Sequence, residues 1–467
     1  MRYLNSRTFT LIFAVVVGTA WGTSATKPNI VYILADDLGY GDVSSYGQSR
    51  FETPHIDRLA REGMRFTQHY SGSTVCAPAR CTLMTGLHTG NAPIRGNGEV
   101  QPEGQQPMPA DTFTIAKYLK KAGYATGVFG KWGLGYPGSS SEPLKMGFDR
   151  FYGYNCQRIA HSYYPAFLWN DDKREFLWGN VASHTRDYAP YFIHEQAIEF
   201  IRENKDQPFF LYYAAIQPHA DMIAPEDYMD KFRGKYLPES ENKGGSYIPQ
   251  PEGHAAFAAM VNVLDDHVGG VLEELDRLGL RENTLVIFAS DNGPHTVGGH
   301  NPDYFDSNGI YRGYKRDLYE GGIRVPMIAS WPGTVESGAV TDHVSAFWDI
   351  LPTAAELVGE PLEAEVDGVS MAPTLTGKGT QKGRDYLYWE FPSRGGRIAL
   401  RQGNWKAVRY NVSKNPDAPV QLFDLSKDPS EENNVAGKHP EVVERLAKLM
   451  AEARQTPEID RYRLWKN

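Results

Sequence analysis

Residues 29–37, Asn-Ile-Val-Tyr-Ile-Leu-Ala-Asp-Asp, decide the fold. The apolar run from Ile30 to Ala35 has the length of a buried strand, and two aspartates follow directly where that strand ends. Three later apolar runs have the same form and are also followed by polar residues: Ala125 to Gly130, Phe209 to Ile216 and Leu285 to Ser290. Continuous apolar runs of this length are typical of strands buried on both faces of a sheet.

Helical patterns lie between these runs. Thr53-Pro54 opens one helix that Gly63 closes, Thr114 to Ala122 is a second, and Ala255 to Leu278 is a long amphipathic third. Helices that connect strands are the crossovers that a parallel sheet requires. The sequence therefore predicts an α/β fold, with a central, mostly parallel sheet flanked by helices.

A smaller C-terminal unit is expected after the sheet-forming part. We place the boundary near Gly377, which gives a large domain of residues 26–377 and an α+β subdomain of residues 378–467. The subdomain is predicted to contain an antiparallel sheet and a terminal helix. Its elements are a hairpin of Arg397 to Leu400 with Trp405 to Tyr410, a strand from Gln421 to Leu425 and a helix from Pro440 to Arg454.

The N-terminus has the features of a secretory signal peptide. Arg2 and Arg7 precede the apolar run Phe9 to Val17, and Thr23-Ser24-Ala25 is a small-residue cleavage site. We expect residues 1–25 to be removed and the mature protein to be periplasmic or extracellular, without a membrane span. A retained N-terminal anchor is the alternative.

Composition excludes several classes of protein. Hydrophobic residues make up 41% of the 467-residue chain and charged residues 22%, which is the composition of a folded globular protein. The formal net charge of −9 gives no general attraction to nucleic acid or to anionic membranes. The three cysteines, Cys76, Cys81 and Cys156, are too few for a disulfide framework. At least one cysteine is therefore expected to take part in the reaction of the protein. Whether Cys81 and Cys156 form a disulfide stays open.

Polar side chains follow each of the four predicted strands. They are Asp36 and Asp37, Lys131, His219, and Asp291 with Asn292. Parallel strands end at one edge of their sheet, so these side chains are expected to converge there. The carboxylate and amide oxygens suit a hard divalent cation such as calcium or magnesium. Ordinary turn residues or helix N-caps are the alternative for each pair alone.

Residues 73–86 contain Cys76-Ala77-Pro78-Ala79-Arg80 followed by Thr85-Gly86. This segment resembles the C-x-P-x-R signature of the formylglycine-dependent sulfatases, a family within the alkaline phosphatase superfamily. Other segments resemble that family's motifs in the family's order. They are Asn29 to Asp42, Gly130-Lys131-Trp132, Gln217-Pro218-His219, Ser290 to Gly293, Gly313-Tyr314-Lys315, Glu320 to Pro326 and Leu422 to Asn434.

The resemblance implies an alkaline-phosphatase-like fold and a modified nucleophile. A formylglycine-generating enzyme would oxidise Cys76 to Cα-formylglycine, whose hydrate would attack sulfur and then eliminate sulfate. One calcium ion would be held by Asp36, Asp37, Asp291 and Asn292, with the modified Cys76 as a further ligand. Arg80 would orient the hydrate, and Lys131 and Lys315 would bind sulfate oxygens. His219 would donate to the bridging oxygen or protonate the leaving alcohol.

One position departs from the family pattern. The family usually has histidine after Gly-Lys-Trp, whereas this chain has Gly133. Which residue replaces that histidine is open, with His161, His295 and His300 as candidates. His161 and His295 are also expected to contact the substrate. Residues Ala220-Asp221 likewise differ from the family's frequent x-Pro after the motif histidine.

The expected substrate is a sulfate ester of a carbohydrate, with an aryl sulfate as the other possibility. An aromatic stretch that looks like a loop carries faces suited to sugar rings: Tyr152, Tyr154, Tyr163, Tyr164 and Trp169. Core packing is an equal alternative for these rings. The rival functions are a phosphatase or phosphodiesterase of the same superfamily, and a non-catalytic protein that binds sulfated glycans.

Overall fold

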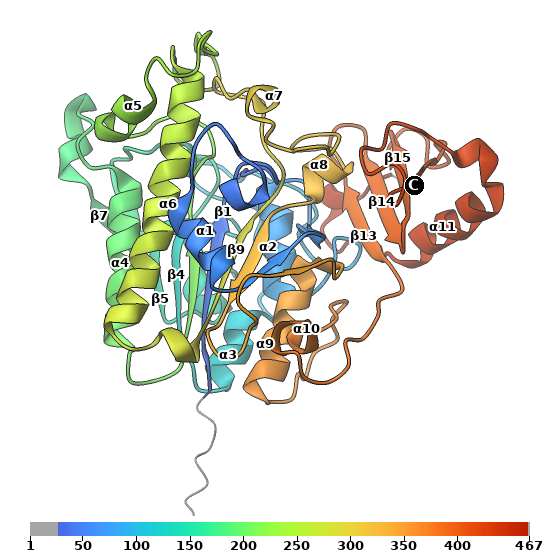
Figure 1. The fold of residues 1–467 in the computed structure, drawn as a ribbon, viewed down its shortest axis with the longest axis horizontal. Helices are drawn as coiled ribbons and strands as arrows, with labels where there is room; N and C mark the ends of the chain where they lie inside the picture. Colours follow the sequence, from blue (N-terminus) through green and yellow to red (C-terminus); the bar gives the residue numbers. More distant parts are fainter. Residues whose placement is uncertain (1–26, 466–467) are drawn as a thin grey trace, which may run out of the picture.

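The four apolar runs form neighbouring strands of one ten-stranded sheet in the computed structural model, which describes residues 27–465 (Figure 1). The predicted signal peptide, residues 1–25, lies outside the described residues. In spatial order the strands are β11 (Ala339–Thr341), β2 (Met64–Phe66), β10 (Met327–Ser330), β9 (Thr284–Ser290), β1 (Asn29–Ala35), β8 (Phe209–Ala214), β4 (Ala125–Lys131), β5 (Arg150–Tyr154), β6 (Phe167–Asn170) and β7 (Lys173–Phe176).

The centre of this sheet is parallel, and an antiparallel strand borders it on each side. Strands β9, β1, β8, β4 and β5 run in one direction, and β10 and β6 pair antiparallel on either side of them. The predicted fold class is therefore confirmed. Because the four predicted strands are adjacent, the residues that follow them meet at one edge of the sheet.

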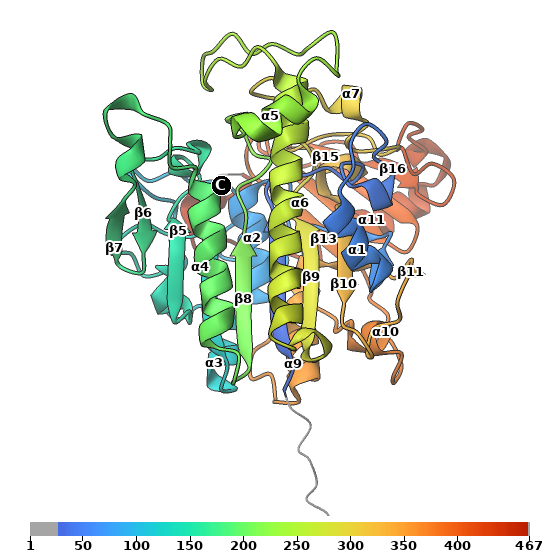
Figure 2. The same cartoon turned by 60° about the vertical axis from the view of Figure 1, so that its left-hand side comes forward.

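Helices cover both faces of the sheet, as Figure 2 shows. One face is covered by α1 (Pro54–Arg61), α4 (Ala189–Glu203) and α6 (Gly253–Arg277), and the other by α2 (Cys76–Thr85), α3 (Ile115–Lys121) and α9 (Ile350–Val358). Successive side chains of a strand point to opposite faces, so the side chains of β1 are divided between the two layers of helices. Val31 and Ile33 pack with the first set of helices, whereas Tyr32 and Leu34 pack with the second.

The remaining elements are short. They are α5 (Glu226–Phe232), α7 (Pro302–Phe305), α8 (Glu320–Ile323), α10 (Ala372–Thr376), the two-stranded sheet of β3 (His69–Tyr70) with β12 (Ser345–Ala346), and the 3-10 helices η1 (Ser44–Tyr46), η2 (Pro143–Met146), η3 (Ile159–His161), η4 (Trp178–Ser183), η5 (Arg281–Asn283), η6 (Phe347–Asp349), η7 (Ala436–Lys438) and η8 (Asp460–Tyr462).

The long helix α6 has the length and hydropathy of a membrane span, although the mature protein is expected to have none. However, 83% of its most apolar window is buried inside the protein. It packs against α1, α4 and α5. Helix α6 is therefore built as a core helix.

The C-terminal part forms a four-stranded antiparallel sheet with a terminal helix, seen in orange and red in Figure 1. Its elements are β13 (Leu387–Phe391), β14 (Arg397–Gln402), β15 (Trp405–Tyr410), β16 (Gln421–Asp424) and α11 (Pro440–Glu452). Leu400 and Leu422 face α11, whereas Trp389 and Val408 pack on the large domain. Gly377 ends α10, before β13 begins, and the domain boundary at this glycine remains our proposal.

The predicted aromatic loop is instead strand and core. Tyr152 and Tyr154 lie on β5, and with Tyr163 they are at most 1% exposed within the core beneath α4 and α6. Trp169 lies on β6 and donates to Glu103. The interpretation of this stretch as a set of sugar-facing rings is therefore wrong for the three buried tyrosines, because their rings fill the core.

Candidate active site

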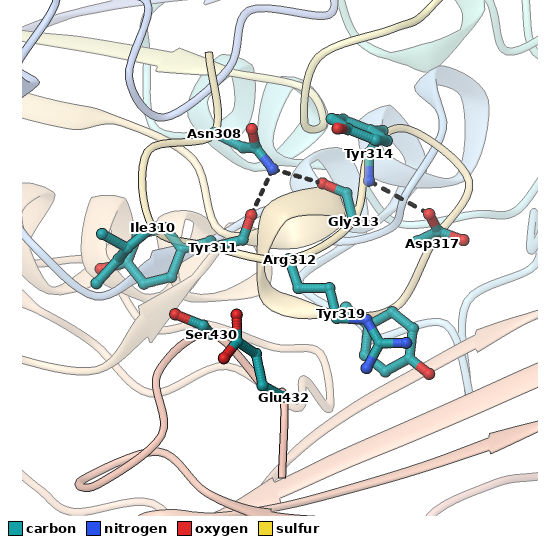
Figure 3. A pocket seen from close by; sticks show the side chains of 10 residues that line it. All are labelled: Asn308, Ile310, Tyr311, Arg312, Gly313, Tyr314, Asp317, Tyr319, Ser430 and Glu432. Atoms are coloured by element: carbon teal, nitrogen blue, oxygen red, sulfur yellow. Dashed lines mark hydrogen bonds between the residues drawn. The ribbon is translucent and has the colours of Figure 1, made fainter. Parts of the chain in front are cut away.

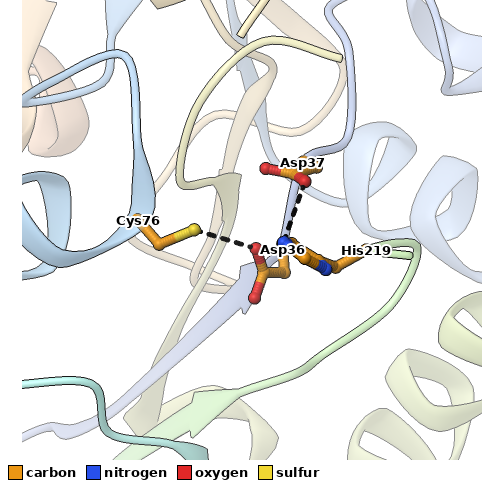
Figure 4. A group of neighbouring side chains, drawn as sticks. All are labelled: Asp36, Asp37, Cys76 and His219. Atoms are coloured by element: carbon orange, nitrogen blue, oxygen red, sulfur yellow. Dashed lines mark hydrogen bonds and ion pairs between the residues drawn. The ribbon is translucent and has the colours of Figure 1, made fainter. Parts of the chain in front are cut away.

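The side chains that follow the central strands meet at one edge of the sheet. Figure 4 shows Asp36 and Asp37, which follow β1, beside Cys76 and His219. The backbone fixes this meeting, because Asp36 N–H donates to Gln217 O over 2.9 Å and Asp291 N–H donates to Ala35 O over 3.0 Å. The structure therefore confirms that the residues after these strands converge.

Cys76 and Arg80 reach the same site from helix α2. Cys76 is the first residue of α2, and Pro78 fits the first turn because no backbone N–H is needed there. Arg80 lies one turn further along, so both side chains lie on the same face of the helix. The Cys76 thiol donates to Asp36 Oδ1 over 3.5 Å, and Lys315 Nζ lies 3.7 Å from the sulfur.

Three carboxylates face three cations at this site. Lys131 Nζ is 2.5 Å from Asp36 Oδ2, Lys315 Nζ is 2.6 Å from Asp37 Oδ2, and Arg80 Nη2 is 2.9 Å from Asp291 Oδ2. The second contact of Arg80 is with Asp36 Oδ2, at 3.3 Å. All six side chains are almost completely buried. With this balance, a bound dication would leave the site positive, which suits an anionic ester.

The paired aspartates stay ionised despite their burial. Burial acts to raise the pKa of Asp36, but Lys131 and then His219 and Arg80 hold it below its usual value. Burial likewise acts to raise the pKa of Asp37, which Lys315 keeps well below its usual value. Two charged carboxylates are therefore available at the end of β1.

Asp291 and Cys76 behave in the opposite way. Burial and then the charge of Asp36 raise the pKa of Asp291 to about 7. Burial and the same charge raise the pKa of the Cys76 thiol to about 12. As a plain thiol, Cys76 is therefore protonated and a poor nucleophile near neutral pH.

Four histidines extend outward from the aspartates. His219 Nε2 lies 3.4 Å from Asp37 Oδ2, while its Nδ1–H donates to the Ala220 carbonyl. The ring of His161 stacks on that of His219, with centroids 4.7 Å apart. His295 lies 6.0 Å from His219, whereas His300 lies behind it, stacked on Phe257. His161 and His295 therefore adjoin the site, and His300 packs in the core.

The donor set fits a hard divalent cation. One ligand atom each of Asp36, Asp37, Cys76 and His219 lies within 4.8 Å of the others. Asn292 adds a buried amide oxygen that has no hydrogen-bond partner, while its Nδ2 donates to Asp37 Oδ1 over 2.7 Å. A buried acceptor without a partner is costly, so Oδ1 is well suited to a metal ion. His219 is the one group in this cluster that was not predicted as a ligand.

Gln157 fills the space beside Gly133, the position at which the family pattern has histidine. Gly133 has φ +74°, and a Cβ there would lie 2.4 Å from Gln157 Nε2. Gln157 Nε2 donates to the Gly133 carbonyl over 3.2 Å. The glycine is therefore required by both the backbone conformation and the packing.

Cys81 and Cys156 are both free and buried. The Cys81 sulfur lies 3.8 Å from that of Met108. The open question of their pairing is thus answered for this structure, and only Cys76 lies at the site.

A separate pocket of about 720 Å³ flanks the loop that carries Lys315 (Figure 3). Lys315 itself does not line it. The lining residues come from this loop and from the C-terminal part: Asn308, Ile310, Tyr311, Arg312, Gly313, Tyr314, Asp317, Tyr319, Ser430 and Glu432. One loop thus borders both the catalytic edge and an open surface pocket.

Comparison with known families decides the identity. The family model described as Sulfatase matches residues 28–360, which is more than half of the chain. The chain belongs to the sulfatase family. A second model, N-sulphoglucosamine sulphohydrolase, C-terminal, matches residues 309–456. Sulfatases are sulfuric ester hydrolases.

Individual relatives of this sulfatase cover most of its length. Human arylsulfatase A is 33% identical over 94% of this chain and 89% of its own. N-acetylgalactosamine-6-O-sulfatase of Bacteroides thetaiotaomicron is 31% identical over 92% and 93%. The crystal structure of Ps i-CgsB in complex with k-i-k-neocarrahexaose is similar at a TM-score of 0.78 and 28% identity, covering 93% of this chain and 94% of that chain. The fold is that of the alkaline phosphatase superfamily.

One residue near the sulfatase site was not found from the sequence. Tyr247, in the loop before α6, lies 5.7 Å from His161 by ring centroids. Burial raises the pKa of Tyr247, while the charge of Lys315 acts to lower it. No local pattern marks this tyrosine, because only the folding of a Gly- and Pro-rich loop brings it there.

Proposed function

We propose that this sulfatase hydrolyses a sulfate ester of a carbohydrate with the help of one calcium ion, through Cα-formylglycine made from Cys76 by a formylglycine-generating enzyme. The observation that carries the proposal is the position of Cys76. It begins α2 next to both Asp36 and Lys315, with its sulfur 3.5 Å from Asp36 Oδ1 and 3.7 Å from Lys315 Nζ.

The chain's own residues have distinct tasks in this proposal. Lys131 and Lys315 bind the oxygens of the sulfate group as buried point charges, for which burial strengthens the attraction. Arg80 orients the group at position 76 from one helical turn away. His219 donates from Nδ1 to a carbonyl, so its Nε2 faces the site and, once the ring carries a second proton, protonates the leaving oxygen.

The metal and the modified residue supply two kinds of chemistry. Calcium, held by Asp36, Asp37, Asp291 and Asn292 with position 76 as a further ligand, would withdraw charge from a bound sulfate oxygen. A formylglycine hydrate would supply the attacking hydroxyl that the protonated thiol of Cys76 lacks. Calcium suits the oxygen donors of Asp36, Asp37, Asp291 and Asn292, and both groups fit the charge balance of the site.

A carbohydrate is the favoured substrate class. Among the similar proteins, one is named for N-acetylgalactosamine 6-O-sulfate chemistry and another is bound to a neocarrahexaose. His161 and His295, beside His219, are assigned to contact the sugar or to assist the proton transfers. The rival aryl sulfate is smaller and would leave these two side chains without a sugar to contact.

Mass spectrometry of the peptide that contains Cys76, prepared from the native host, tests the nucleophile. The expected result is the mass of an aldehyde in place of the thiol, together with sulfate release from sulfated sugars. An unmodified thiol and binding of sulfated glycans without sulfate release would instead indicate a binding protein. Release of phosphate but not of sulfate would indicate a phosphatase or phosphodiesterase.

Export of the protein is tested separately. We propose that residues 1–25 are removed during secretion, so Edman sequencing of the protein from the native host should begin near Thr26. Recovery of the intact N-terminus in the membrane fraction would support a retained anchor instead.

A further inference from the structure

Three rings form a row that leads outward from the catalytic edge. His219, at the inner end of the row, is 4% exposed, and its Nε2 lies 3.4 Å from Asp37 Oδ2. The ring of His161 stacks on that of His219 at a centroid distance of 4.7 Å, and the ring of Tyr247 contacts His161 at 5.7 Å. His161 and Tyr247 are both partly exposed. The row of rings therefore runs from the buried carboxylates toward solvent.

Asp221 fixes the outer part of this row. Its backbone N–H donates to the His161 carbonyl over 3.3 Å. Its Oδ1 accepts from the N–H of Ile248, the residue directly after Tyr247, over 3.0 Å. A single residue thus holds the backbone at His161 and the backbone next to Tyr247, which are the two sides of the outer ring contact.

Position 221 is also where the chain departs from the family pattern, which often has proline there. Proline has neither a backbone N–H nor a carboxylate, so it could make neither of these hydrogen bonds. The departure therefore has a structural consequence in this chain. It ties the loop before α6 to the segment that carries His219.

The loop that carries Tyr247 is also closed on itself. Asn242 and Gln250 exchange two backbone hydrogen bonds, each 2.8 Å long. The Asn242 side chain donates to the Ile248 carbonyl over 2.5 Å, and the Gln250 side chain donates to the Met222 carbonyl over 2.8 Å. The position of Tyr247 is therefore set before a substrate binds, which lowers the entropy that binding costs.

We propose that the ring of Tyr247 packs against the sugar that carries the sulfate ester, and that Asp221 is the residue that positions this ring. The inference rests on the proposed function and adds to it the residue that contacts the sugar ring. In the proposed reaction His219 protonates the bridging oxygen, so the sugar lies next to His219. The row of rings begins at that histidine, and the apolar face of a tyrosine suits the C–H face of a sugar.

The test separates binding of the sugar from binding of the sulfate. The substrate is the sulfated sugar from which the wild type releases sulfate, and its desulfated form and inorganic sulfate serve as inhibitors. In Tyr247→Ala, the KM of the substrate and the inhibition constant of the desulfated sugar should rise about tenfold, while kcat changes less than about threefold. The inhibition constant of inorganic sulfate should keep its wild-type value, because sulfate engages the buried lysines and not this ring.

Further variants show whether the ring and Asp221 act together. Tyr247→Phe keeps the ring and should stay within about twofold of wild type. Asp221→Ala should raise the same two constants about threefold, but should add nothing in Tyr247→Ala. Asp221→Asn keeps an oxygen that accepts from Ile248 and should behave as wild type. Tyr191→Ala, at a 39% exposed tyrosine on α4, is the control and should leave all constants unchanged.

Several results would overturn the proposal. An unchanged KM in Tyr247→Ala, or an equal rise for the desulfated sugar and for inorganic sulfate, would remove the ring from the sugar's binding site. Additive effects of Asp221→Ala and Tyr247→Ala would mean that Asp221 does not act through the ring.

Failure of the proposed function would be seen separately, as a wild type that releases no sulfate. Calorimetric titration with sulfated sugars and with sodium sulfate then still tests Tyr247. The affinity for the sugars, but not for sodium sulfate, should fall in Tyr247→Ala. A wild type that binds none of these sugars would overturn the inference as well.

Discussion

Lys315 Nζ donates to Asp37 Oδ2 over 2.6 Å, and both side chains are buried. The ammonium group also lies 3.7 Å from Cys76 Sγ, so it joins a proposed metal ligand to the proposed nucleophile position. Without a cation, the Asp37 carboxylate would be buried and uncompensated. The lysine therefore serves the stability of the site as well as its chemistry.

Lys315→Ala should lower kcat/KM by at least about 100-fold, because a buried charge that binds the sulfate is lost. In the presence of a chelator it should also lower the free energy of unfolding by about 3–5 kcal/mol. Added calcium should restore part of that loss by compensating Asp37. Thermal unfolding with and without calcium checks this, with Lys448→Ala at an exposed lysine as the control. Equal unfolding of Lys315→Ala and wild type in chelator would contradict the argument.

Asn292→Ala should weaken calcium binding about tenfold, because the buried Oδ1 without a partner is lost as a ligand. Isothermal titration of the metal-stripped protein measures the change. Asn301→Ala, at an exposed asparagine that caps α7 without a side-chain hydrogen bond, is the matched control. Calcium binding of wild-type strength in Asn292→Ala would remove Asn292 from the proposed ligand set.

Gly133→Ala should be destabilising through both backbone strain and contact with Gln157. Gly123 offers a control, because its φ is +89° and a Cβ there meets nothing within 4 Å. Gly123→Ala should cost about 1 kcal/mol of unfolding free energy, and Gly133→Ala about 1–3 kcal/mol more. Adding Gln157→Ala should recover part of the difference in urea unfolding. If both substitutions lower the free energy of unfolding equally, the Gln157 side chain moves aside without cost.

Glu431→Gln should change how stability depends on pH. Lys406 Nζ lies 2.7 Å from Glu320 and 3.3 Å from Glu431, all fully buried. Burial raises the pKa of Glu431 to about 7, although Lys406 opposes this shift. The folded state therefore keeps a proton that the unfolded chain, with its ordinary lower pKa, has lost, so the free energy of unfolding falls as pH rises from about 4.5 to about 7.

The variant lacks this titration. Relative to that of wild type, the free energy of unfolding of Glu431→Gln should rise by up to about 3 kcal/mol between pH 5 and pH 8. Denaturant unfolding at the two pH values measures the gain, and Glu432→Gln, at the exposed neighbour, should show none. A constant difference between variant and wild type across this range would show that Glu431 titrates normally.

The centre of the fold could be predicted from the sequence because its strands are buried on both faces. Such strands must be continuous apolar runs, as β1 and β9 are, and their polar ends stand out against them. The same contrast identified Asp36, Asp291 and their neighbours as a convergent group. The short flanking strands β5 and β6 lack that contrast, so the sequence there indicates a loop.

Contacts between distant side chains could not be predicted. Nothing in the sequence around Gly133 shows that Gln157 fills the space beside it, and nothing around Tyr247 shows that its ring lies near His161. The hydrophobic pattern also does not give the strand order, which depends on how both helical layers pack. Such relationships arise only when separate elements pack together.

The C-terminal sheet has a consequence for the order in which the chain is completed. Trp389 donates to the Ser71 carbonyl over 2.9 Å, and its ring packs in one cluster with Tyr70 and Val75, next to Cys76. This cover is synthesised long after Cys76 has left the ribosome. Until β13 to β15 are made, the apolar surface around Cys76 lacks its outer wall. The proposed modifying enzyme would have that interval in which to reach the cysteine.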